Sequence, residues 1–365
     1  GLLVFLQMFQ GPRLKLQVAR QWAAHEVLPA RPGDITDRHG RLLATTVSVR
    51  SLFVVPARIE QRWQVACQLA DALGQDRERV FKRISAHRDK QFLWIARRLT
   101  DEQAAIIREL DLPRDAYGFR DEFLRVYPQG AIAAQVLGLR DIDGIGRGGL
   151  EEALDSALRG RDGRRAVVRD ARGHIVEVSE RITRPPQHGQ TIRLTLDAVI
   201  QLHAQRALQK IMRDWKPKSA CAIVLDPRTG GVLAMANCPT FDPNQLNDIP
   251  DDAWKNTAIY EPGSTFKPFI VATAIEQGLV QPDEMFDCEN GEYRMGRRIL
   301  HDHHPYHELS VTDILVKSSN IGMAKIGERL TNQGIYDSAV KFGFGRKTGI
   351  ELPGELTGIL RPLKL

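Results

Sequence analysis

Residues 261–269 have the sequence Glu-Pro-Gly-Ser-Thr-Phe-Lys-Pro-Phe and lead into an apolar run over 270–275. Because Glu-Pro-Gly is typical of a turn, we expect Ser264 in the first turn of a helix, with Lys267 on the same face. A serine hydroxyl becomes a nucleophile when a base removes its proton, and a lysine is such a base when burial or a cation lowers its pKa. The N–H groups at a helix start also favour a developing oxyanion. Taken alone, the four residues fit a surface N-cap serine and a solvated lysine better.

A second polar motif, Ser318-Ser319-Asn320, follows a helix predicted to start at residues 310–313 and precedes another predicted over 321–330. A tight connection between two helices directs a hydroxyl and an amide into a cleft. The simpler alternative is a local side-chain cap, which is common for Ser and Asn in turns.

The composition is that of a globular protein with 42% hydrophobic residues, and 365 residues are enough for two domains. The net charge is +6, carried largely by Arg-rich stretches at 77–98 and 159–172. No basic patch is interleaved with aromatic residues, so we expect no nucleic acid partner. The charge indicates either mild attraction to anionic surfaces or a solvated face.

Cysteine and histidine give weak signals. No Cys-x-x-Cys pair occurs, which argues against a zinc knuckle, and a disulfide between Cys221 and Cys238, which flank a predicted hairpin, stays undecided. The histidines at 301, 303, 304 and 307 raise the alternative of a metal site. No His-x-x-x-His pair or acidic pattern accompanies them, so we expect no metal and no other cofactor.

The chain starts with an apolar stretch over residues 1–9, shorter than the roughly 20 residues that span a bilayer. It fits either the outer end of a membrane anchor or a buried terminus. Residues 14–25 then predict a polar amphipathic helix.

In the first half, hydrophobic periodicity and turn residues predict a series of short elements. The first is a strand–turn–strand over 33–44, continued at 47–55. Helices follow over 60–73 (with Trp63 on the apolar stripe), 80–84 and 100–110 (with a capping box from Thr100 and Gln103). After them come a short helix at 131–137, a glycine-rich loop at 141–149, a helix over 149–159, a hairpin over 166–178 that turns at 171–173, and a linker at 184–189.

The second half is predicted to start with a strand over 191–196 and a helix from Asp197 to about Arg213. That helix is expected to bury Ile200, Ala204, Leu208 and Ile211. A hairpin of strands at 219–225 and 231–236 follows, then the Ser264 helix. This order indicates an α+β fold.

Together, these motifs resemble the class B penicillin-binding proteins, the serine D,D-transpeptidases that cross-link peptidoglycan. The resemblance spans nearly the whole chain and rests on an ordered set of motifs. They are Ser264-Thr265-Phe266-Lys267, Lys317-Ser318-Ser319-Asn320-Ile321-Gly322, the hairpin Asp226-Pro227 with Gly230 to Ala236, and in the first half Gly33-x-Ile35-x-Asp37-Arg38-x-Gly40, Arg125-x-Tyr127-Pro128-x-Gly130 and Gly149-Leu150-Glu151.

Two positions and one motif depart from the family pattern. Pro32 and Gln135 stand where the family usually has arginine and often histidine. The third family motif is a Lys-Thr-Gly on an edge strand, more distant from Ser-x-Asn than Lys347-Thr348-Gly349 is here. Pro353 follows closely, and proline suits a pairing strand poorly. We therefore expect residues 347–349 to be a loop without a role in the chemistry, and the chain to end before the true motif.

The resemblance implies a remnant of a membrane anchor at 1–10, a mixed α/β pedestal (dimerisation) domain at 11–185, and the N-terminal part of an α+β serine transpeptidase domain, penicillin-binding/β-lactamase-like, at 190–365. It implies catalytic roles for Ser264, Lys267, Ser318 and Asn320, with D-Ala-D-Ala stem peptides as substrates and β-lactams as inhibitors. It further implies a single-pass anchor in the cytoplasmic membrane, a periplasmic or extracytoplasmic bulk, and a glycosyltransferase partner of the pedestal.

Two alternatives remain. A β-lactam sensor or serine β-lactamase shares Ser-x-x-Lys, although the pedestal half argues against a small β-lactamase. A chain that is naturally this short would instead be a non-catalytic cell-wall scaffold.

Overall fold

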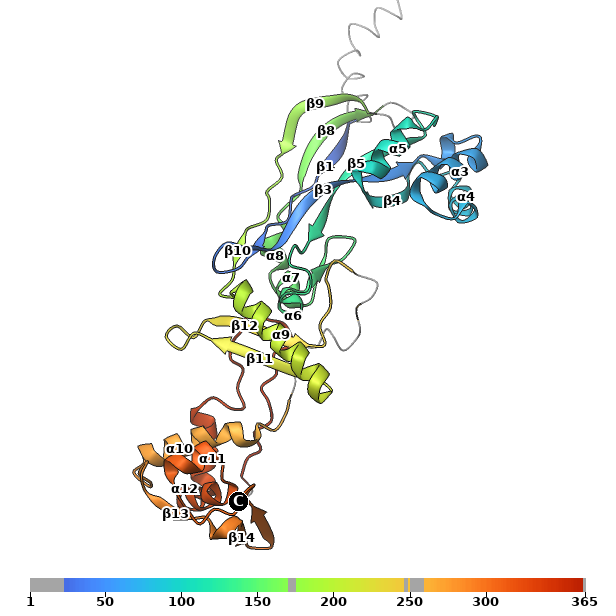
Figure 1. Ribbon diagram of the computed structural model, residues 1–365. Helices are drawn as coiled ribbons and strands as arrows, with labels where there is room; N and C mark the ends of the chain where they lie inside the picture. Colours follow the sequence, from blue (N-terminus) through green and yellow to red (C-terminus); the bar gives the residue numbers. More distant parts are fainter. Residues whose placement is uncertain (1–22, 170–174, 246–248, 250–258, 364–365) are drawn as a thin grey trace, which may run out of the picture. The chain divides into compact units, whose positions relative to one another are not determined.

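The computed structural model describes residues 23–169, 175–245, 249 and 259–363. The chain divides into two compact units, Gly1–Lys255 and Asn256–Leu365 (Figure 1). Within the described residues, no helix combines the length and the apolar character needed to cross a membrane. The predicted helix at 14–25 and the turn at 171–173 lie largely or wholly outside the described residues.

The first unit is built on a sheet in the order β10-β2-β3-β4, with β5 also paired to β3. β3 and β5 run antiparallel from Thr45↔Val126 to Val54↔Tyr117 and lie side by side in Figure 1. The strand bounds are β2(Ile35–Thr36), β3(Leu42–Val54), β4(Leu93–Leu99), β5(Tyr117–Val126) and β10(Ile192–Arg193). The predicted strand–turn–strand is confirmed, but the strand predicted at 191–196 is wrong in extent. Only two of its residues pair, in parallel with β2, because β2 itself is only two residues long.

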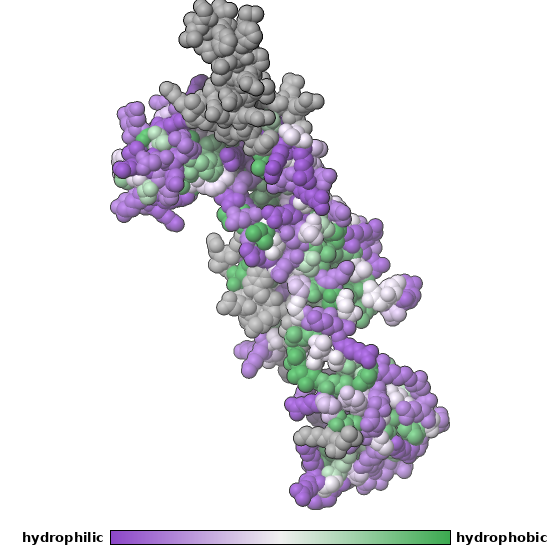
Figure 2. All heavy atoms as spheres, turned by 180° about the vertical axis from the view of Figure 1, so that it is seen from behind, coloured by the Kyte–Doolittle hydropathy of each residue, from purple (hydrophilic) through white to green (hydrophobic). Residues whose placement is uncertain are grey.

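Three helices cover one end of this sheet: α3(Arg62–Leu73), α4(Arg77–Ala86) and α5(Asp101–Glu109). Their core includes Leu69, Ile84 and Ile107, each fully buried. The predicted capping box at Thr100 and Gln103 is confirmed, with both hydrogen bonds present. Trp63 was expected in the core and is 53% exposed, because α3 buries Val65, Ala66 and Leu69 instead. The outer surface of these helices is mostly hydrophilic (Figure 2).

A second antiparallel sheet joins β1(Ala23–Leu28), β8(Gly163–Arg169) and β9(Ile175–Arg184), which confirms the pairing of the predicted hairpin. Short elements complete the first unit. η2(Pro56–Arg58) follows β3, and five more lie between β5 and β8: α6(Ala134–Leu137), β6(Leu139–Arg140), β7(Gly146–Arg147), α7(Gly149–Ala153) and α8(Asp155–Arg159). The glycine-rich loop thus carries a small hairpin that sequence reasoning missed, and the helix predicted over 149–159 breaks at Leu154. Gly149 has φ +52°, and a Cβ there would lie 2.5 Å from the backbone oxygen of Val136, so the position requires glycine.

α9(Ala198–Trp215) packs on the hairpin of β11(Ala220–Leu225) and β12(Val232–Cys238). Asp197 caps α9 as predicted, accepting hydrogen bonds from the N–H groups of Val199 and Ile200. The predicted buried face is partly wrong. Ile211 is 42% exposed, whereas Gln201 and Gln205 are buried because both side chains bind backbone groups of neighbouring segments.

This α9–hairpin layer is hydrogen-bonded to the rest of the first unit. Gln205 binds the carbonyl oxygen of Ala131, and Gln135 donates to that of Pro239. Asn244 exchanges two hydrogen bonds with the backbone of Tyr127. One face of β11 carries exposed apolar side chains, and hydrophobic colour gathers over this layer in Figure 2. Cys221 and Cys238 are both free thiols, so the hairpin has no disulfide.

The second unit surrounds a small core of residues such as Val271, Ala274, Ile314, Ile321 and Ile326. Its elements are η3(Gly263–Phe266), α10(Lys267–Glu276), β13(Met285–Asp287), η4(Glu289–Gly291), β14(Glu292–Met295), β15(Arg298–His301), β16(Glu308–Ser310), α11(Val311–Lys317) and α12(Asn320–Lys341). β13 pairs with β16 and β14 with β15, both antiparallel. α12 is longer than predicted, although the backbone of Thr331 (φ 66°, ψ 164°) departs from helical geometry within it.

Candidate active site

Ser264 lies in the short η3 turn that leads directly into α10, and Lys267 is the first residue of α10. Pro268 fits this position because a proline in the first helical turn lacks only an N–H that has no intrahelical partner. Gly263 has φ +57° and forms the turn that precedes Ser264. The local sequence therefore places both the serine and the lysine, three residues apart, at the start of a helix.

The Lys267 amine contacts the connection between α11 and α12. Its Nζ donates to Ser318 Oγ at 3.0 Å and to Asn320 Oδ1 at 2.9 Å. It also lies 2.7 Å from the carbonyl oxygen of Ser318 and 3.3 Å from that of Ser319. Three of the four predicted site residues thus meet at one nitrogen, although more than 50 residues separate Lys267 from the other two.

Backbone geometry explains how Ser318 reaches the amine. Ser318 is the C-cap of α11 and has left-handed backbone angles, φ 57° and ψ 39°. Few residues other than glycine adopt that region, so a serine there carries backbone strain. The next residue, Ser319, is fully buried and caps α12 by accepting a hydrogen bond from the N–H of Gly322. The chain reverses within two residues and brings Ser318 and Asn320 to the same side.

Asp302, which the sequence prediction did not single out, holds this connection in place. Its Oδ1 accepts from the N–H of Asn320 at 2.5 Å and from that of Ile321 at 3.2 Å. Its Oδ2 accepts from Ser319 Oγ at 2.6 Å. In residues 301–307 the sequence suggested the histidines as candidate site residues. The residue that makes these contacts is instead Asp302, which lies between His301 and His303.

The orientation of the Asn320 amide follows from its second partner. Asn320 Nδ2 donates to the carbonyl oxygen of His301 at 3.0 Å, which leaves Oδ1 facing Lys267. A carbonyl accepts but cannot donate, so this contact fixes which end of the amide is nitrogen. The loop that follows β15 therefore orients Asn320, while Asp302 anchors its backbone.

Burial lowers the pKa of Lys267 below its ordinary value, and the negative charge of Asp302 opposes this effect. Desolvation disfavours the ammonium form, so the neutral amine becomes accessible at lower pH. Ser264 is exposed at the start of the same helix. Within the part of the chain that the structure describes, its hydroxyl makes no hydrogen bond, so the structure brings Lys267, Ser318 and Asn320 together without closing a serine–lysine contact.

Cys288 lies behind this cluster. It is fully buried, and its Sγ is 3.6 Å from Ser319 Oγ. Burial raises the pKa of the Cys288 thiol, which keeps it protonated and inert. In the described residues, no three His, Cys, Asp or Glu side chains converge as metal ligands.

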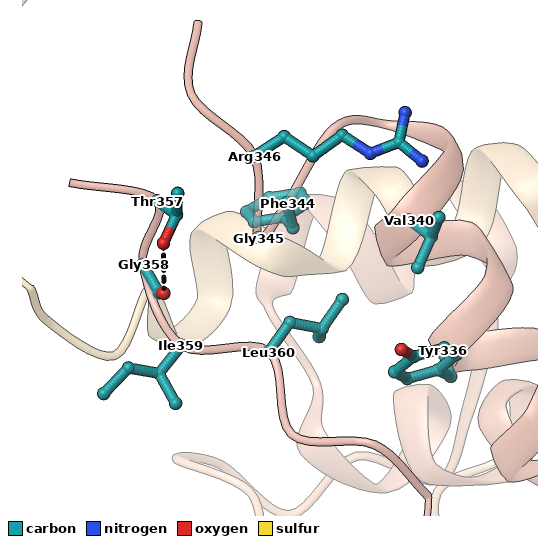
Figure 3. A pocket seen from close by; sticks show the side chains of 9 residues that line it. All are labelled: Tyr336, Val340, Phe344, Gly345, Arg346, Thr357, Gly358, Ile359 and Leu360. Carbon is teal, nitrogen blue, oxygen red and sulfur yellow. Dashed lines mark hydrogen bonds between the residues drawn. The ribbon is translucent and has the colours of Figure 1, made fainter. Parts of the chain in front are cut away.

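A cavity of about 490 Å³ in the second unit is lined by none of these residues, and Figure 3 shows the side chains that line it. The Thr357 hydroxyl on its rim bonds the carbonyl of Gly358 at 3.1 Å, and no nucleophile with a base lines it. Its lining consists of Tyr336, Val340, Phe344, Gly345, Arg346 and residues 357–360. We therefore do not assign chemistry to this cavity.

Residues 347–349 form a loop, as expected. The backbone N–H of Thr348 and its hydroxyl both bind Glu355, each at 2.5 Å. The Thr348 hydroxyl is thus already occupied by a local carboxylate.

Two family models match the chain: a penicillin-binding protein dimerisation domain over residues 27–194 and a penicillin-binding protein transpeptidase domain over residues 220–365. The chain therefore belongs to the class B penicillin-binding proteins, which place a dimerisation domain before a transpeptidase domain. The domain boundary predicted at 185–190 stays a prediction.

Curated relatives and solved structures agree with this family. The chain is 34% identical to the probable peptidoglycan D,D-transpeptidase PenA of Neisseria gonorrhoeae, over 98% of this chain and 62% of the relative. It is 33% identical to the peptidoglycan D,D-transpeptidase FtsI of Escherichia coli K12, over 90% of this chain and 56% of the relative. The crystal structure of penicillin-binding protein 3 from Mycobacterium tuberculosis, complexed with aztreonam, matches with a TM-score of 0.64 and 31% identity, over 92% of this chain and 58% of that one. The chain thus spans about three fifths of the length of these relatives.

Proposed function

We propose that this chain carries the nucleophile and the base of a peptidoglycan D,D-transpeptidase. The substrate is a stem peptide that ends in D-Ala-D-Ala. Ser264 attacks the carbonyl carbon of the penultimate D-Ala, the peptide bond breaks, and terminal D-Ala leaves with a proton on its amine. The amine of a second stem peptide then attacks the ester of Ser264, which forms the cross-link and frees the hydroxyl.

Each site residue has a role in this reaction. Lys267, as the neutral amine, accepts the proton of Ser264. Ser318 passes a proton from Lys267 toward the leaving amine, since its hydroxyl both donates and accepts. Asn320 orients Lys267 and binds the substrate amide, and the N–H of Ser264 contributes to the oxyanion site.

The hydrogen bonds from Lys267 Nζ to Ser318 Oγ and Asn320 Oδ1 are the observation that carries the proposal. They connect the base to the proton relay in one network, and burial lowers the pKa of that base. A solvated surface lysine would have neither property.

Family membership supports the remaining parts of the proposal. β-Lactams acylate Ser264 because they resemble the D-Ala-D-Ala end, and the related Mycobacterium tuberculosis protein was crystallised with two of them. Residues 1–10 belong to a single-pass anchor in the cytoplasmic membrane, with the bulk of the chain on the outer side. The dimerisation domain contacts cell-wall synthesis partners, a glycosyltransferase among them.

The test is covalent labelling of the full-length protein by a fluorescent penicillin. We expect a stable adduct that mass spectrometry places on the peptide containing Ser264. Ser264→Ala should lose all labelling, whereas Ser219→Ala, which changes an exposed serine of the first unit, should keep it. Purified stem peptides should then yield free D-Ala and cross-linked dimers.

Other outcomes separate the alternatives. Absence of labelling in a folded protein would overturn the enzymatic proposal and leave a scaffold. Rapid release of hydrolysed penicillin would indicate a β-lactamase. A stable adduct without peptide cross-linking would indicate a β-lactam sensor.

A further inference from the structure

The turn that carries Ser264 is η3, residues 263–266, and one side chain attaches it to the rest of the second unit. Among the described residues, the hydrogen bonds of this turn run only to Pro262 and Lys267, its own neighbours in sequence. Three of its four residues, Ser264 among them, are exposed, and only Phe266 is half-buried. The position of the turn therefore depends on what packs against Phe266.

The ring of Phe344 packs against Phe266 from outside the helix. The two ring centroids are 5.1 Å apart and the ring planes make an angle of 78°. Phe344 makes a similar contact with Phe269 in the first turn of α10, at 5.3 Å and 82°. Aromatic pairs favour such edge-to-face arrangements, with centroids about 4.5–7 Å apart. Phe344 therefore joins the turn that carries the nucleophile to the start of α10.

The sequence Phe-Gly-Phe-Gly over residues 342–345 explains how Phe344 reaches this place. Phe342 is the C-cap of α12, and Gly343 and Gly345 have left-handed backbone angles, φ +88° and φ +81°. Glycine adopts these angles without a steric penalty, and for this reason it commonly ends helices. The N–H of Phe344 then donates to the carbonyl oxygen of Ala339 at 3.0 Å, which closes the turn. The chain thus reverses after α12 and presents Phe344 to α10.

The base and the body of α10 are held by other contacts. The amine of Lys267 is fixed by its hydrogen bonds to Ser318 and Asn320. Further along the helix, the hydroxyls of Thr273 and Ser338 lie 2.7 Å apart and connect α10 to α12. Neither set of contacts includes η3, so they hold the base without holding the nucleophile.

We propose that Phe344 is a positioning residue for Ser264. It acts through Phe266, whose ring it holds, and so sets where the Ser264 hydroxyl lies relative to the Lys267 amine. Attack on a carbonyl requires a near-attack geometry, and a small displacement of the nucleophile costs much of the rate. The inference rests on the proposed acylation of Ser264.

The test is stopped-flow acylation of the full-length protein by a fluorescent penicillin at increasing concentration. Phe344→Leu keeps an apolar contact but removes the ring edge. It should lower the saturating acylation rate by about tenfold. The half-saturating concentration should stay unchanged, and so should the pH midpoint, because Lys267 keeps its own hydrogen bonds. A change that merely loosened the fold would alter all three quantities.

Two further variants of the same residue separate the ring from its volume. Phe344→Met fills similar space without a ring and should lose rate as Phe344→Leu does. Phe344→Tyr keeps the ring and should restore the rate, since the ring also borders the cavity of about 490 Å³ in Figure 3, which offers space for the added hydroxyl.

Phe342→Leu is the matched control. It makes the same change two residues earlier, in a ring that packs on Phe269 at 5.0 Å and lies outside the contact with Phe266. Its saturating rate should stay near that of the unchanged protein. Phe266→Leu should lose rate as Phe344→Leu does, and the double variant should lose no more than either alone, since both remove one ring pair.

The outcomes separate this inference from the function on which it rests. Absence of labelling in the unchanged protein would overturn the proposed function and this inference with it. A labelled protein whose saturating rate survives Phe344→Leu would overturn the inference alone. An equal loss of rate in Phe342→Leu, or fully additive losses in the double variant, would also overturn it alone.

Discussion

The pKa of the Lys267 amine controls how well this residue accepts a proton. Only the neutral amine is a base, and burial moves its pKa below the ordinary 10.5. The rate of penicillin acylation should therefore rise with pH to a plateau, and the midpoint of the rise should lie below pH 10.5. Lys267→Arg should reduce acylation by about 10²–10⁴-fold, because a guanidinium keeps its proton in this range. Stopped-flow measurement of the pH profile checks both expectations, and a pH-independent rate would contradict them.

How much of the site could be predicted depends on the residue. The helix start with Ser264 and Lys267 follows from local turn chemistry. The convergence of Ser318 and Asn320 on Lys267 does not, because no spacing rule connects residues 51 and 53 positions apart, and only the family resemblance suggested it. Asp302 left no usable signal, since its role depends on where a loop after β15 meets the start of α12.

At the scale of elements, the β15–β16 loop supports α12 through Asp302. A carboxylate that binds N–H groups at a helix start stabilises that helix, and hydrogen bonds to a charged group contribute about 1.5–3 kcal/mol. Asp302→Asn removes the charge and should lower the free energy of unfolding of the second unit by a similar amount. Because the charge of Asp302 raises the pKa of Lys267, its loss should also move the acylation midpoint to lower pH.

Urea denaturation and the pH profile of acylation measure the two effects of Asp302→Asn separately. Asp283→Asn is a suitable control, since this exposed acid in the same unit makes no hydrogen bond with other described residues. A midpoint that stays in place while stability falls would show that Asp302 acts on the fold alone.

The elements themselves differ in how far local sequence determines them. The capping box of α5 and the Asp197 cap of α9 were predictable because cap and helix are adjacent in sequence. The buried face of α9 was not, because Gln201 and Gln205 are buried through hydrogen bonds to distant backbone groups. The two-residue strands β6, β7 and β10 are too short to produce a hydrophobic period.

At the scale of the whole molecule, the α9–hairpin layer belongs to the same compact unit as the dimerisation domain, although the transpeptidase family match begins at residue 220. The polar contacts of Gln135, Gln205 and Asn244 explain why this layer stays with the first unit. They satisfy backbone groups that would otherwise be buried without partners.

Gln205 tests whether these contacts couple the two layers. Its Oε1 accepts from the N–H of Ala133 and its Nε2 donates to the oxygen of Ala131. Gln205→Met therefore leaves the N–H of Ala133 unpaired and removes one of the two hydrogen bonds to the oxygen of Ala131, which keeps the N–H of Ala134. We expect a loss of about 1–3 kcal/mol in the free energy of unfolding. Hydrogen exchange should accelerate in peptides from α6 and from α9 together, while peptides from α12 stay unchanged. Gln209→Met, an exposed change on the same helix, should leave exchange unaltered. Faster exchange in α9 alone would mean that the layer opens independently of the dimerisation domain.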